Sequence, residues 1–231
     1  MNSISQAIEA ICRPTSSTNV IPLHEPDFGG TNAWDYVKDC IDSGWVSTAG
    51  HWVTKFEEAL SVYTGSPYVV AVTNGTVALR LALHLLGVRH DDEVMMPSLS
   101  FVATANAAAH LGAHPHFVDI NYSTLGMCPS ALQQRLREIA IHRDGILINK
   151  QTNRRIAALL PVHVFGHPAD MYALKTVADE WGLPIIEDAA EALGSFLTDT
   201  HCGLFGDIGC LSFNGNKLIT TGGGGALLIA D

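Results

Sequence analysis

A lysine in the last fifteen residues is the first candidate for chemistry. Lys217 lies within S-F-N-G-N-K-L-I-T-T-G-G-G-G, residues 212–225, between a turn sequence and four consecutive glycines. A surface lysine does not need this setting, whereas a lysine held in a dry pocket can act as a nucleophile and form a Schiff base. The glycine run 222–225 allows two interpretations, a close approach of the backbone to a ligand or a mobile strand connection. A dinucleotide fingerprint is disfavoured, because no helical pattern follows these glycines.

A second candidate is an aspartate that follows an apolar run. Asp188 ends the segment P-I-I-E-D at residues 184–188, so its carboxylate is expected at a sheet edge, in a partly desolvated cleft. A buried carboxylate is costly without a partner, and the protonated ring nitrogen of pyridoxal phosphate is a suitable one. The competing interpretation is that Asp188 caps a helix beginning at Ala189.

Two further groups could hold the rest of such a cofactor. Asn74-Gly75-Thr76 precedes an apolar helical pattern, and the free N–H groups of a helix start bind anions, although the same triplet is also an ordinary helix cap. Ser212 could add a second hydroxyl for a phosphate. The ring of Phe101 could stack on a heteroaromatic cofactor, but packing in the core is the commoner role of a phenylalanine.

The segments that must position these side chains alternate between strand-like and helix-like patterns. The apolar runs are Y-V-V-A-V-T (68–73), E-V-M-M-P (93–97), H-F-V-D-I (116–120), R-I-A-A-L-L-P-V-H (155–163) and P-I-I-E-D (184–188). This order predicts an α/β fold of three layers, with a mostly parallel sheet flanked by helices on both faces. Ligands of such sheets bind at the carboxyl ends of the strands, so one pocket could collect all the candidate side chains.

Two segments depart from the alternation. Near the end, G-C-L-S-F-N (209–214) and A-L-L-I-A (226–230) are predicted to be strands with no helix between them. Residues 144–155 are expected to be a polar excursion between a helix and a strand.

Composition excludes several classes of protein. The formal charge of −10 opposes binding to nucleic acids and to acidic membranes. The five cysteines are odd in number and lack metal-ligand spacing, which favours a reducing cytoplasm: Cys12, Cys40, Cys128, Cys202 and Cys210. Residues 1–20 lack the features of a signal peptide and are interpreted as a peripheral segment; no run reaches membrane-spanning length.

The 11 histidines raise the alternative of a metal hydrolase. They include two clusters, His110, His114 and His116, and His163 with His167. Neither cluster belongs to an HExxH-like pattern, so structural or surface histidines are favoured and no metal is predicted.

Five motifs in order carry a resemblance. They are N-G-T-V-A-L (74–79), F-V-A-T-A-N (101–106), P-V-H-V-F-G (161–166), E-D-A-A-E (187–191) and S-F-N-G-N-K (212–217). Together they resemble the DegT/StrS family of pyridoxal phosphate-dependent sugar aminotransferases, of fold type I, from about Ile21 to the last residue. I-P-L-H-E-P-D-F-G-G (21–30) and G-W-V-S-T-A-G (44–50) look most like the subgroup that aminates nucleotide-linked 4-keto sugars on the way to legionaminic acid and bacillosamine-type products.

The resemblance implies a role for each candidate residue. Lys217 would form the Schiff base with pyridoxal 5'-phosphate, and Asp188 would pair with the ring nitrogen. Gly75, Thr76 and Ser212 would hold the phosphate, and Phe101 would stack on the ring. Glu191 stands where many relatives have His or Gln near the phenolic oxygen of the cofactor, and T-T-G-G-G-G (220–225) replaces the commoner T-T-G-E-G-G. Trp45, Ser47 and Thr48 are candidates for substrate contact, with Trp45 alternatively a core or interface residue.

The resemblance also implies a reaction and an organisation. An amino group would pass from an amino-acid donor, by analogy glutamate, to a nucleotide-linked 4-keto-6-deoxy sugar, in polysaccharide biosynthesis in the cytoplasm. Residues 21–231 would be an incomplete large domain, with the small C-terminal domain of the family missing, so the chain is either a fragment or a truncated product. A full-length protein is expected to form a homodimer. The alternative from another class is a remnant or interaction protein that binds the cofactor but has lost turnover.

Overall fold

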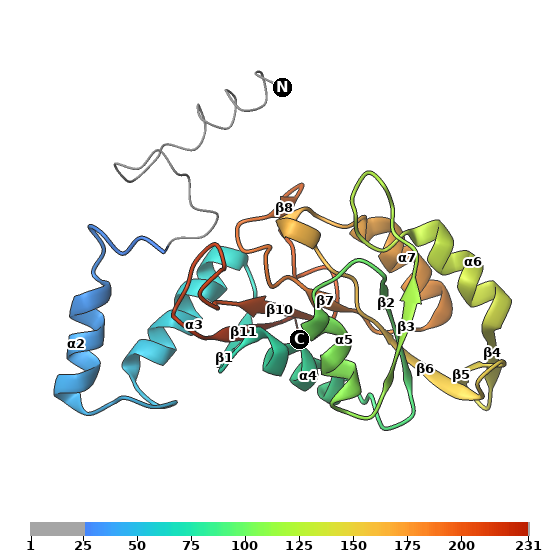
Figure 1. The fold of residues 1–231 in the computed structure, drawn as a ribbon, viewed down its shortest axis with the longest axis horizontal. Coiled ribbons are helices and arrows are strands. Elements are labelled where there is room, and N and C mark those ends of the chain that lie inside the picture. Colours follow the sequence, from blue (N-terminus) through green and yellow to red (C-terminus); the bar gives the residue numbers. More distant parts are fainter. Residues whose placement is uncertain (1–25, 231) are drawn as a thin grey trace, which may run out of the picture.

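A computed structural model describes residues 26–230 (Figure 1). The predicted peripheral segment 1–20 lies outside the described residues. The described chain begins with helices α2 (Ala33–Ser43) and α3 (His51–Thr64). Each ends at a glycine in the left-handed conformation, Gly44 and Gly65, which closes a helix without steric cost.

The centre of the molecule is a mostly parallel sheet. Its strands are β1 (Tyr68–Val72), β2 (Glu93–Pro97), β3 (His114–Val118), β6 (Arg154–Leu159), β7 (Ile186–Asp188), β10 (Ile208–Ser212) and β11 (Gly225–Ile229). Two ladders, β1-β11-β10-β7 and β3-β2-β6, are joined by parallel bridges from Leu159 to Ile185 and from Val162 to Asp188. β11 is antiparallel to both of its neighbours, β1 and β10, and the pairs β10–β7, β2–β3 and β2–β6 are parallel.

Helices cover both faces of the sheet, which confirms the predicted three-layer α/β fold. Helices α4 (Gly75–Leu85) and α5 (Val102–Ala109) share one core cluster, and α6 (Pro129–Ile139) and α7 (Met171–Trp181) share another. The consecutive residues Met95 and Met96 of β2 belong to different clusters. Since successive side chains of a strand point to opposite faces, a continuous apolar run supplies both cores.

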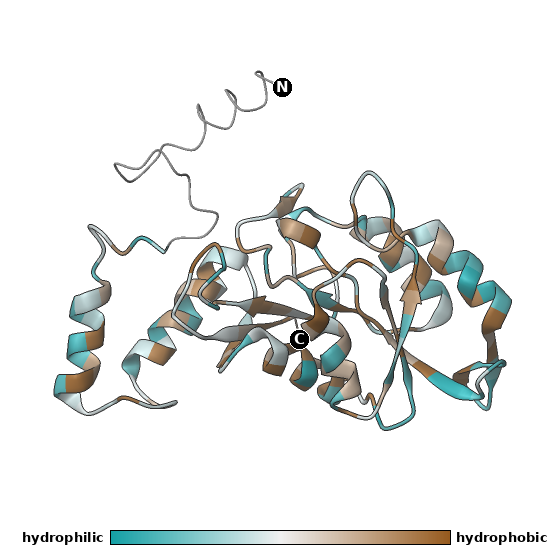
Figure 2. Cartoon of the chain, in the orientation of Figure 1, coloured by the Kyte–Doolittle hydropathy of each residue, from teal (hydrophilic) through white to brown (hydrophobic). Residues whose placement is uncertain are grey.

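The predicted polar excursion at 144–155 is wrong in part. Strands β4 (Ala140–Arg143) and β5 (Ile146–Asn149) form an antiparallel hairpin that extends the sheet beside β6. Asp144 and Gly145 form its turn with φ of 53° and 77°, the left-handed conformations that an Asp-Gly hairpin turn requires. The strands read A-I-H-R and I-L-I-N, two short runs that are mostly apolar, and Figure 2 shows hydrophilic residues around them at this end of the sheet.

Helix α2 stands apart from the three layers (Figure 1). It has no buried residue, although it carries large apolar side chains such as Trp34 and Ile41, which are 73% and 63% exposed. A second small hairpin, β8 (Phe196–Leu197) with β9 (Thr200–His201), lies beyond β7 in the chain. No helix among residues 26–230 is both long and apolar enough to cross a bilayer.

Candidate active site

The carboxylate of Asp188 lies buried at the carboxyl end of β7, with 5% of the residue exposed. Its Oδ2 accepts a hydrogen bond from Thr104 Oγ1 at 2.7 Å, and its Oδ1 accepts the N–H of Ala190 at 3.2 Å. Burial raises the pKa of Asp188, and these two donors and the charge of Lys217 offset that effect only in part. The alternative of a helix cap is wrong, because residues 189–195 form turns and no helix.

The first turn of α5 connects Asp188 to an exposed aromatic ring. Thr104, which binds Asp188, also donates its backbone N–H to the carbonyl of Phe101, the N-cap residue of α5. Phe101 is 71% exposed, so the alternative of core packing is wrong for this side chain. Sequence reasoning missed the role of Thr104, although its spacing of three from Phe101 on a predicted helix places both in one turn.

The turn at residues 74–76 packs directly against the end of β10. The side chain of Asn74 accepts the N–H of Val77 at 2.9 Å and caps α4. A Cβ on Gly75 would lie 2.8 Å from the Cβ of Ser212, so only glycine allows this contact. The turn therefore brings Gly75, Thr76 and Ser212 together at a helix N-terminus, where free N–H groups and two hydroxyls can receive a phosphate.

Lys217 lies in the loop that joins β10 to β11. The base of the loop is closed by two backbone hydrogen bonds, from Phe213 N–H to Gly224 and from Thr221 N–H to Phe213. The lysine Nζ lies 3.3 Å from Glu191 Oε1 and 6.0 Å from the centroid of the Phe101 ring. The amine of Lys217 thus faces the aromatic ring that α5 positions next to Asp188.

The glycine run beside this lysine makes a close approach within the chain itself. A Cβ on Gly225 would lie 2.6 Å from the carbonyl carbon of Asn74, so β11 begins in contact with the turn at residues 74–76. This contact is made within the chain, so it tests neither interpretation of residues 222–225, the approach to a ligand or the mobile connection.

Glu191 uses both carboxylate oxygens. Oε1 faces Lys217, and Oε2 accepts the backbone N–H of Phe165 at 3.1 Å. The side chain is 41% exposed, so Glu191 lies at the surface of the site. It therefore couples the lysine loop to the turn that follows β6.

A second buried carboxylate, Glu187, points away from Asp188 on the other face of β7. Its two oxygens accept three backbone N–H groups of residues 203–206 at 2.6–2.9 Å. Nε2 of His163 lies 2.9 Å from Glu187, and its Nδ1 accepts the N–H of Ala169 at 3.1 Å. Since Nδ1 is an acceptor, the ring proton lies on Nε2 and is donated to Glu187. This pair holds the loops behind Asp188.

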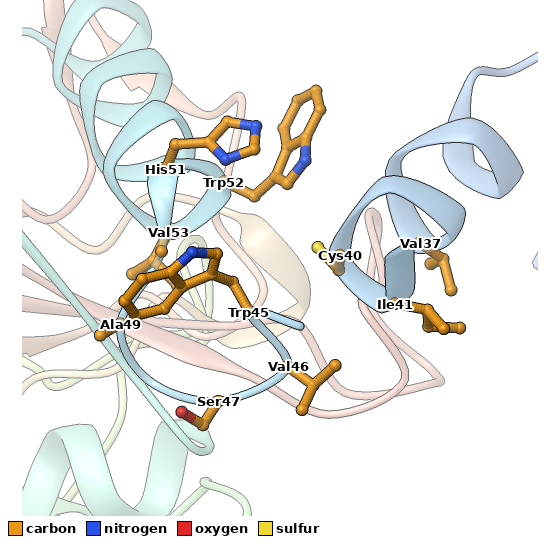
Figure 3. Close-up of a pocket in the computed structure, with 11 residues that line it drawn as sticks. Val37, Cys40, Ile41, Trp45, Val46, Ser47, Ala49, His51, Trp52 and Val53 are labelled. Atoms are coloured by element: carbon orange, nitrogen blue, oxygen red, sulfur yellow. The ribbon is translucent and has the colours of Figure 1, made fainter. Parts of the chain in front are cut away.

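The three predicted substrate residues lie in another place. Trp45 and Ser47 line an apolar cavity of about 290 Å³ between α2 and the start of α3 (Figure 3). All residues that line this cavity come from positions 37–53, and Thr48 is not among them. Trp45 is 57% exposed, so it is no core residue. Within this chain the cavity brings none of the three side chains to Lys217.

A larger cavity, of about 600 Å³, does include Lys217. The lysine loop forms one side of it, and residues 26–36, among them Asp27, Phe28 and Tyr36, form the other. Sequence reasoning gave these residues no role. The available signal was the segment H-E-P-D-F-G-G, which contributed only to the resemblance.

Three histidines of the predicted clusters have carboxylate partners. His114 binds Asp91 at 3.1 Å, His116 binds Glu93 at 2.9 Å, and His163 binds Glu187 at 2.9 Å. Among residues 26–230, no group of three or more His, Cys, Asp or Glu side chains is arranged to hold a metal ion.

The arrangement fits a flat cationic ring with an aldehyde and a phosphate. A buried carboxylate with two hydrogen bonds and a raised pKa at Asp188 suits a positively charged ring nitrogen. The exposed face of Phe101 suits the ring, Lys217 suits the aldehyde, and the turn at Gly75 suits the phosphate. Pyridoxal phosphate combines these groups.

Several known proteins are similar to this chain. GDP-perosamine synthase of Escherichia coli O157:H7 is 39% identical over 91% of this chain and 53% of its own length. EpsN of Bacillus subtilis (strain 168), provisionally designated a pyridoxal phosphate-dependent aminotransferase, is 40% identical over 91% of this chain and 52% of its own. The crystal structure of DesI with its TDP-sugar product superposes with a TM-score of 0.76 at 31% identity, over 90% of this chain and 48% of DesI.

The chain therefore spans about half the length of the curated relatives it matches. A profile of the DegT/DnrJ/EryC1/StrS aminotransferases matches residues 29–231, which include Gly75, Phe101, Asp188, Ser212 and Lys217. The predicted fold of type I agrees with these structural neighbours. On this match and this fold, the chain belongs to the DegT/DnrJ/EryC1/StrS aminotransferase family.

Proposed function

We propose that the chain carries the pyridoxal phosphate site of an aminotransferase that moves an amino group to a nucleotide-linked 4-keto-6-deoxy sugar. One observation carries the proposal: the first turn of α5 joins the buried Asp188 to the exposed ring of Phe101, and the amine of Lys217 faces that ring. One edge of the sheet thus carries Asp188 for the ring nitrogen, Phe101 for stacking on the ring and Lys217 for the aldehyde.

Each residue has a defined task in this reaction. When bound, pyridoxal phosphate withdraws electrons from the carbon that bears the amine. Asp188 keeps a proton on the ring nitrogen, and its burial makes an ionic partner necessary. Lys217 would hold the aldehyde of the cofactor, and its free amine would carry a proton to and from the reacting carbon. Gly75, Thr76 and Ser212 would hold the phosphate and so orient the ring.

The substrate class is taken from the relatives. Two GDP-perosamine synthases, of Escherichia coli O157:H7 and Vibrio cholerae, are 39% and 37% identical to the chain, and DesI was crystallised with a TDP-sugar. We infer a nucleotide-linked keto sugar as amino acceptor and glutamate as donor. The legionaminic acid and bacillosamine subgroup is a finer prediction, since the named relatives are perosamine synthases.

The organisation of the whole protein also belongs to the proposal. Residues 21–231 would form the large, cofactor-binding domain, and a homodimer in the cytoplasm would make a sugar for polysaccharide biosynthesis. Trp45, Ser47 and Thr48 remain proposed substrate contacts. Because the cavity lined by Trp45 and Ser47 does not include Lys217, they would have to contact substrate in an assembly of two copies or in a rearranged position.

The test is an assay of amino transfer. The chain is saturated with pyridoxal phosphate and incubated with glutamate and a GDP- or TDP-linked 4-keto-6-deoxy sugar, and the amino sugar is detected by mass spectrometry. The proposal predicts an amino sugar that depends on both the cofactor and the donor. Cofactor bound at Lys217 without any transfer would favour the noncatalytic alternative.

A further inference from the structure

The turn after β6 presents a phenylalanine in a strained conformation. Phe165 has φ of 55° and ψ of 25° within the short helix η1 (Val164–Gly166), and it is 80% exposed. A bulky side chain in this left-handed region is less stable than in an ordinary backbone conformation. Strain of this kind persists where the surrounding structure enforces it, and it concentrates at functional sites.

Contacts on both sides of the turn enforce the strain. The backbone N–H of Phe165 is held by Glu191, and the carbonyl of Gly166 accepts the hydroxyl of Ser195 at 2.6 Å. A Cβ on Gly166 would lie 2.6 Å from the backbone oxygen of Glu191, so the two loops are in direct contact. On the inner side, the buried ring of His163 accepts the N–H of Ala169. The turn is rigid, and its apex projects an unburied aromatic ring.

The ring lies at the same edge of the sheet as the proposed active site. Val162, three residues before Phe165, bridges to Asp188 in parallel, so the turn continues from the strand end beside that carboxylate. Glu191 contacts Phe165 with one oxygen and Lys217 with the other. Phe101 and Phe165 are thus two exposed rings that both belong to the surroundings of Lys217.

The charges at this edge favour a neutral partner for the second ring. Asp188 and Glu191 are carboxylates, and both face Lys217. A dicarboxylate donor such as glutamate would meet like charge beside Phe165, whereas the hexose of a nucleotide sugar is neutral and has an apolar C–H face. Aromatic side chains combine apolar contact area with a defined geometry for such a face.

We infer that Phe165 is a binding residue for the keto sugar, and that its ring packs on the apolar face of the deoxyhexose. This inference rests on the proposed function and makes Phe165 a residue that determines specificity for the sugar. The strain then has a use, because an ordinary backbone conformation would direct the ring elsewhere.

The test compares Phe165→Asn with Phe165→Tyr. Asparagine tolerates the left-handed conformation but removes the ring, and tyrosine keeps the ring. Binding of a GDP-linked 4-keto-6-deoxy hexose, and of its TDP-linked counterpart, is measured by isothermal titration calorimetry. The protein is loaded with pyridoxal phosphate in the aldehyde form, which has no amino group to give, so binding is observed without turnover. Cofactor uptake and the melting temperature of each variant are measured in parallel.

Phe165→Asn is expected to weaken sugar binding about tenfold, while Phe165→Tyr stays within about twofold. Both variants should take up the cofactor like the parent, and Phe165→Asn should melt at the same temperature or higher because the strain is relieved. The control is Thr198→Asn, at an exposed residue with φ of 57° in the β8–β9 turn. It should leave sugar binding unchanged.

Equal sugar binding by the parent and Phe165→Asn would overturn this inference alone. The same holds if Phe165→Asn loses cofactor uptake and stability together, because the residue would then be structural. A parent chain that takes up cofactor but binds neither sugar would overturn the inference and the proposed substrate class. A parent that takes up no cofactor would overturn the proposed function as a whole.

Discussion

Two buried carboxylates lie at opposite edges of the sheet and have opposite surroundings. Glu93, the first residue of β2, is 3% exposed and accepts hydrogen bonds from His116, Asn149 and Thr152 at 2.5–2.9 Å. Burial acts to raise its pKa, but these donors lower it to about 2. Asp188, the last residue of β7, is about as buried, yet its pKa is raised.

The two carboxylates differ in the number of hydrogen-bond donors that they receive from the chain. Protein donors satisfy the carboxylate of Glu93. They also satisfy the carboxylate of Glu187, which accepts hydrogen bonds from three backbone N–H groups and from the His163 ring. Asp188 has Thr104 and one backbone N–H. A structural carboxylate is therefore satisfied within the chain, whereas Asp188 is left to be stabilised by a cation that the chain does not supply in full.

The largest expected effect comes from Asp188→Asn. The amide has the same shape but cannot hold a positive ring nitrogen, so amino transfer should fall about a thousandfold. The change also removes a buried acid whose pKa is raised. Such an acid destabilises the fold above its unfolded pKa, so the free energy of unfolding at pH 7 should stay the same or rise. Steady-state assays and urea denaturation measure the two effects. A large loss of stability would show that the fold depends on the Asp188 carboxylate as it does on that of Glu93.

Glu93→Gln should show the reverse pattern. It leaves several buried donors without an anionic acceptor and should lower the free energy of unfolding by about 2 kcal/mol, measured in urea at pH 7. Amino transfer per folded molecule should not change, because the residue lies at the other edge of the sheet. A specific loss of transfer without loss of stability would show that the two edges are not independent.

Acid titration sharpens the same contrast. The pKa of Glu93 falls from 4.5 to about 2 on folding, so its contribution is present above pH 4.5 and is lost as the pH drops toward 2. The parent should therefore lose stability over this window more steeply than Glu93→Gln. Parallel curves for the two proteins, followed by circular dichroism, would exclude Glu93 as a cause of acid unfolding.

The smallest expected effect comes from Thr104→Val. Loss of the hydroxyl removes one of the two hydrogen bonds to Asp188 and should cost about 1 kcal/mol of stability. Its consequence should be greater in the cofactor-free protein, because the bound cation would compensate for the lost donor. Melting temperatures with and without pyridoxal phosphate measure this difference, and an equal loss in both forms would argue against an ionic partner at Asp188.

Much of the fold could be predicted from its pattern, because parallel strands that are buried on both faces form continuous apolar runs. The run with Met95 and Met96 is such a case, since it feeds two cores. The β4–β5 hairpin was missed because each of its strands has only four residues and polar residues surround them; the Asp144-Gly145 turn was the available signal.

For the site, the sequence placed Gly75, Asp188 and Lys217 at or after strand ends, which the structure has on one edge of the sheet, whereas the predicted substrate residues Trp45 and Ser47 line a cavity without Lys217. It could not reveal their partners. The bonds from Thr104 to Asp188 and from Phe165 to Glu191 span 84 and 26 residues, and they depend on how helices and turns are placed after folding. Phe28 and Tyr36 were missed for the same reason, because only the folded chain places their segment across a cavity from Lys217.

The proposed role of Lys217 is tested most directly by locating the covalently bound cofactor. The chain is incubated with pyridoxal phosphate, reduced with borohydride and digested, and the modified peptide is identified by mass spectrometry, with Lys217→Arg as the control. One pyridoxyl group per chain is expected on Lys217, with no specific labelling of the variant. Labelling spread over surface lysines such as Lys175, and equal in both proteins, would rule out this role of Lys217.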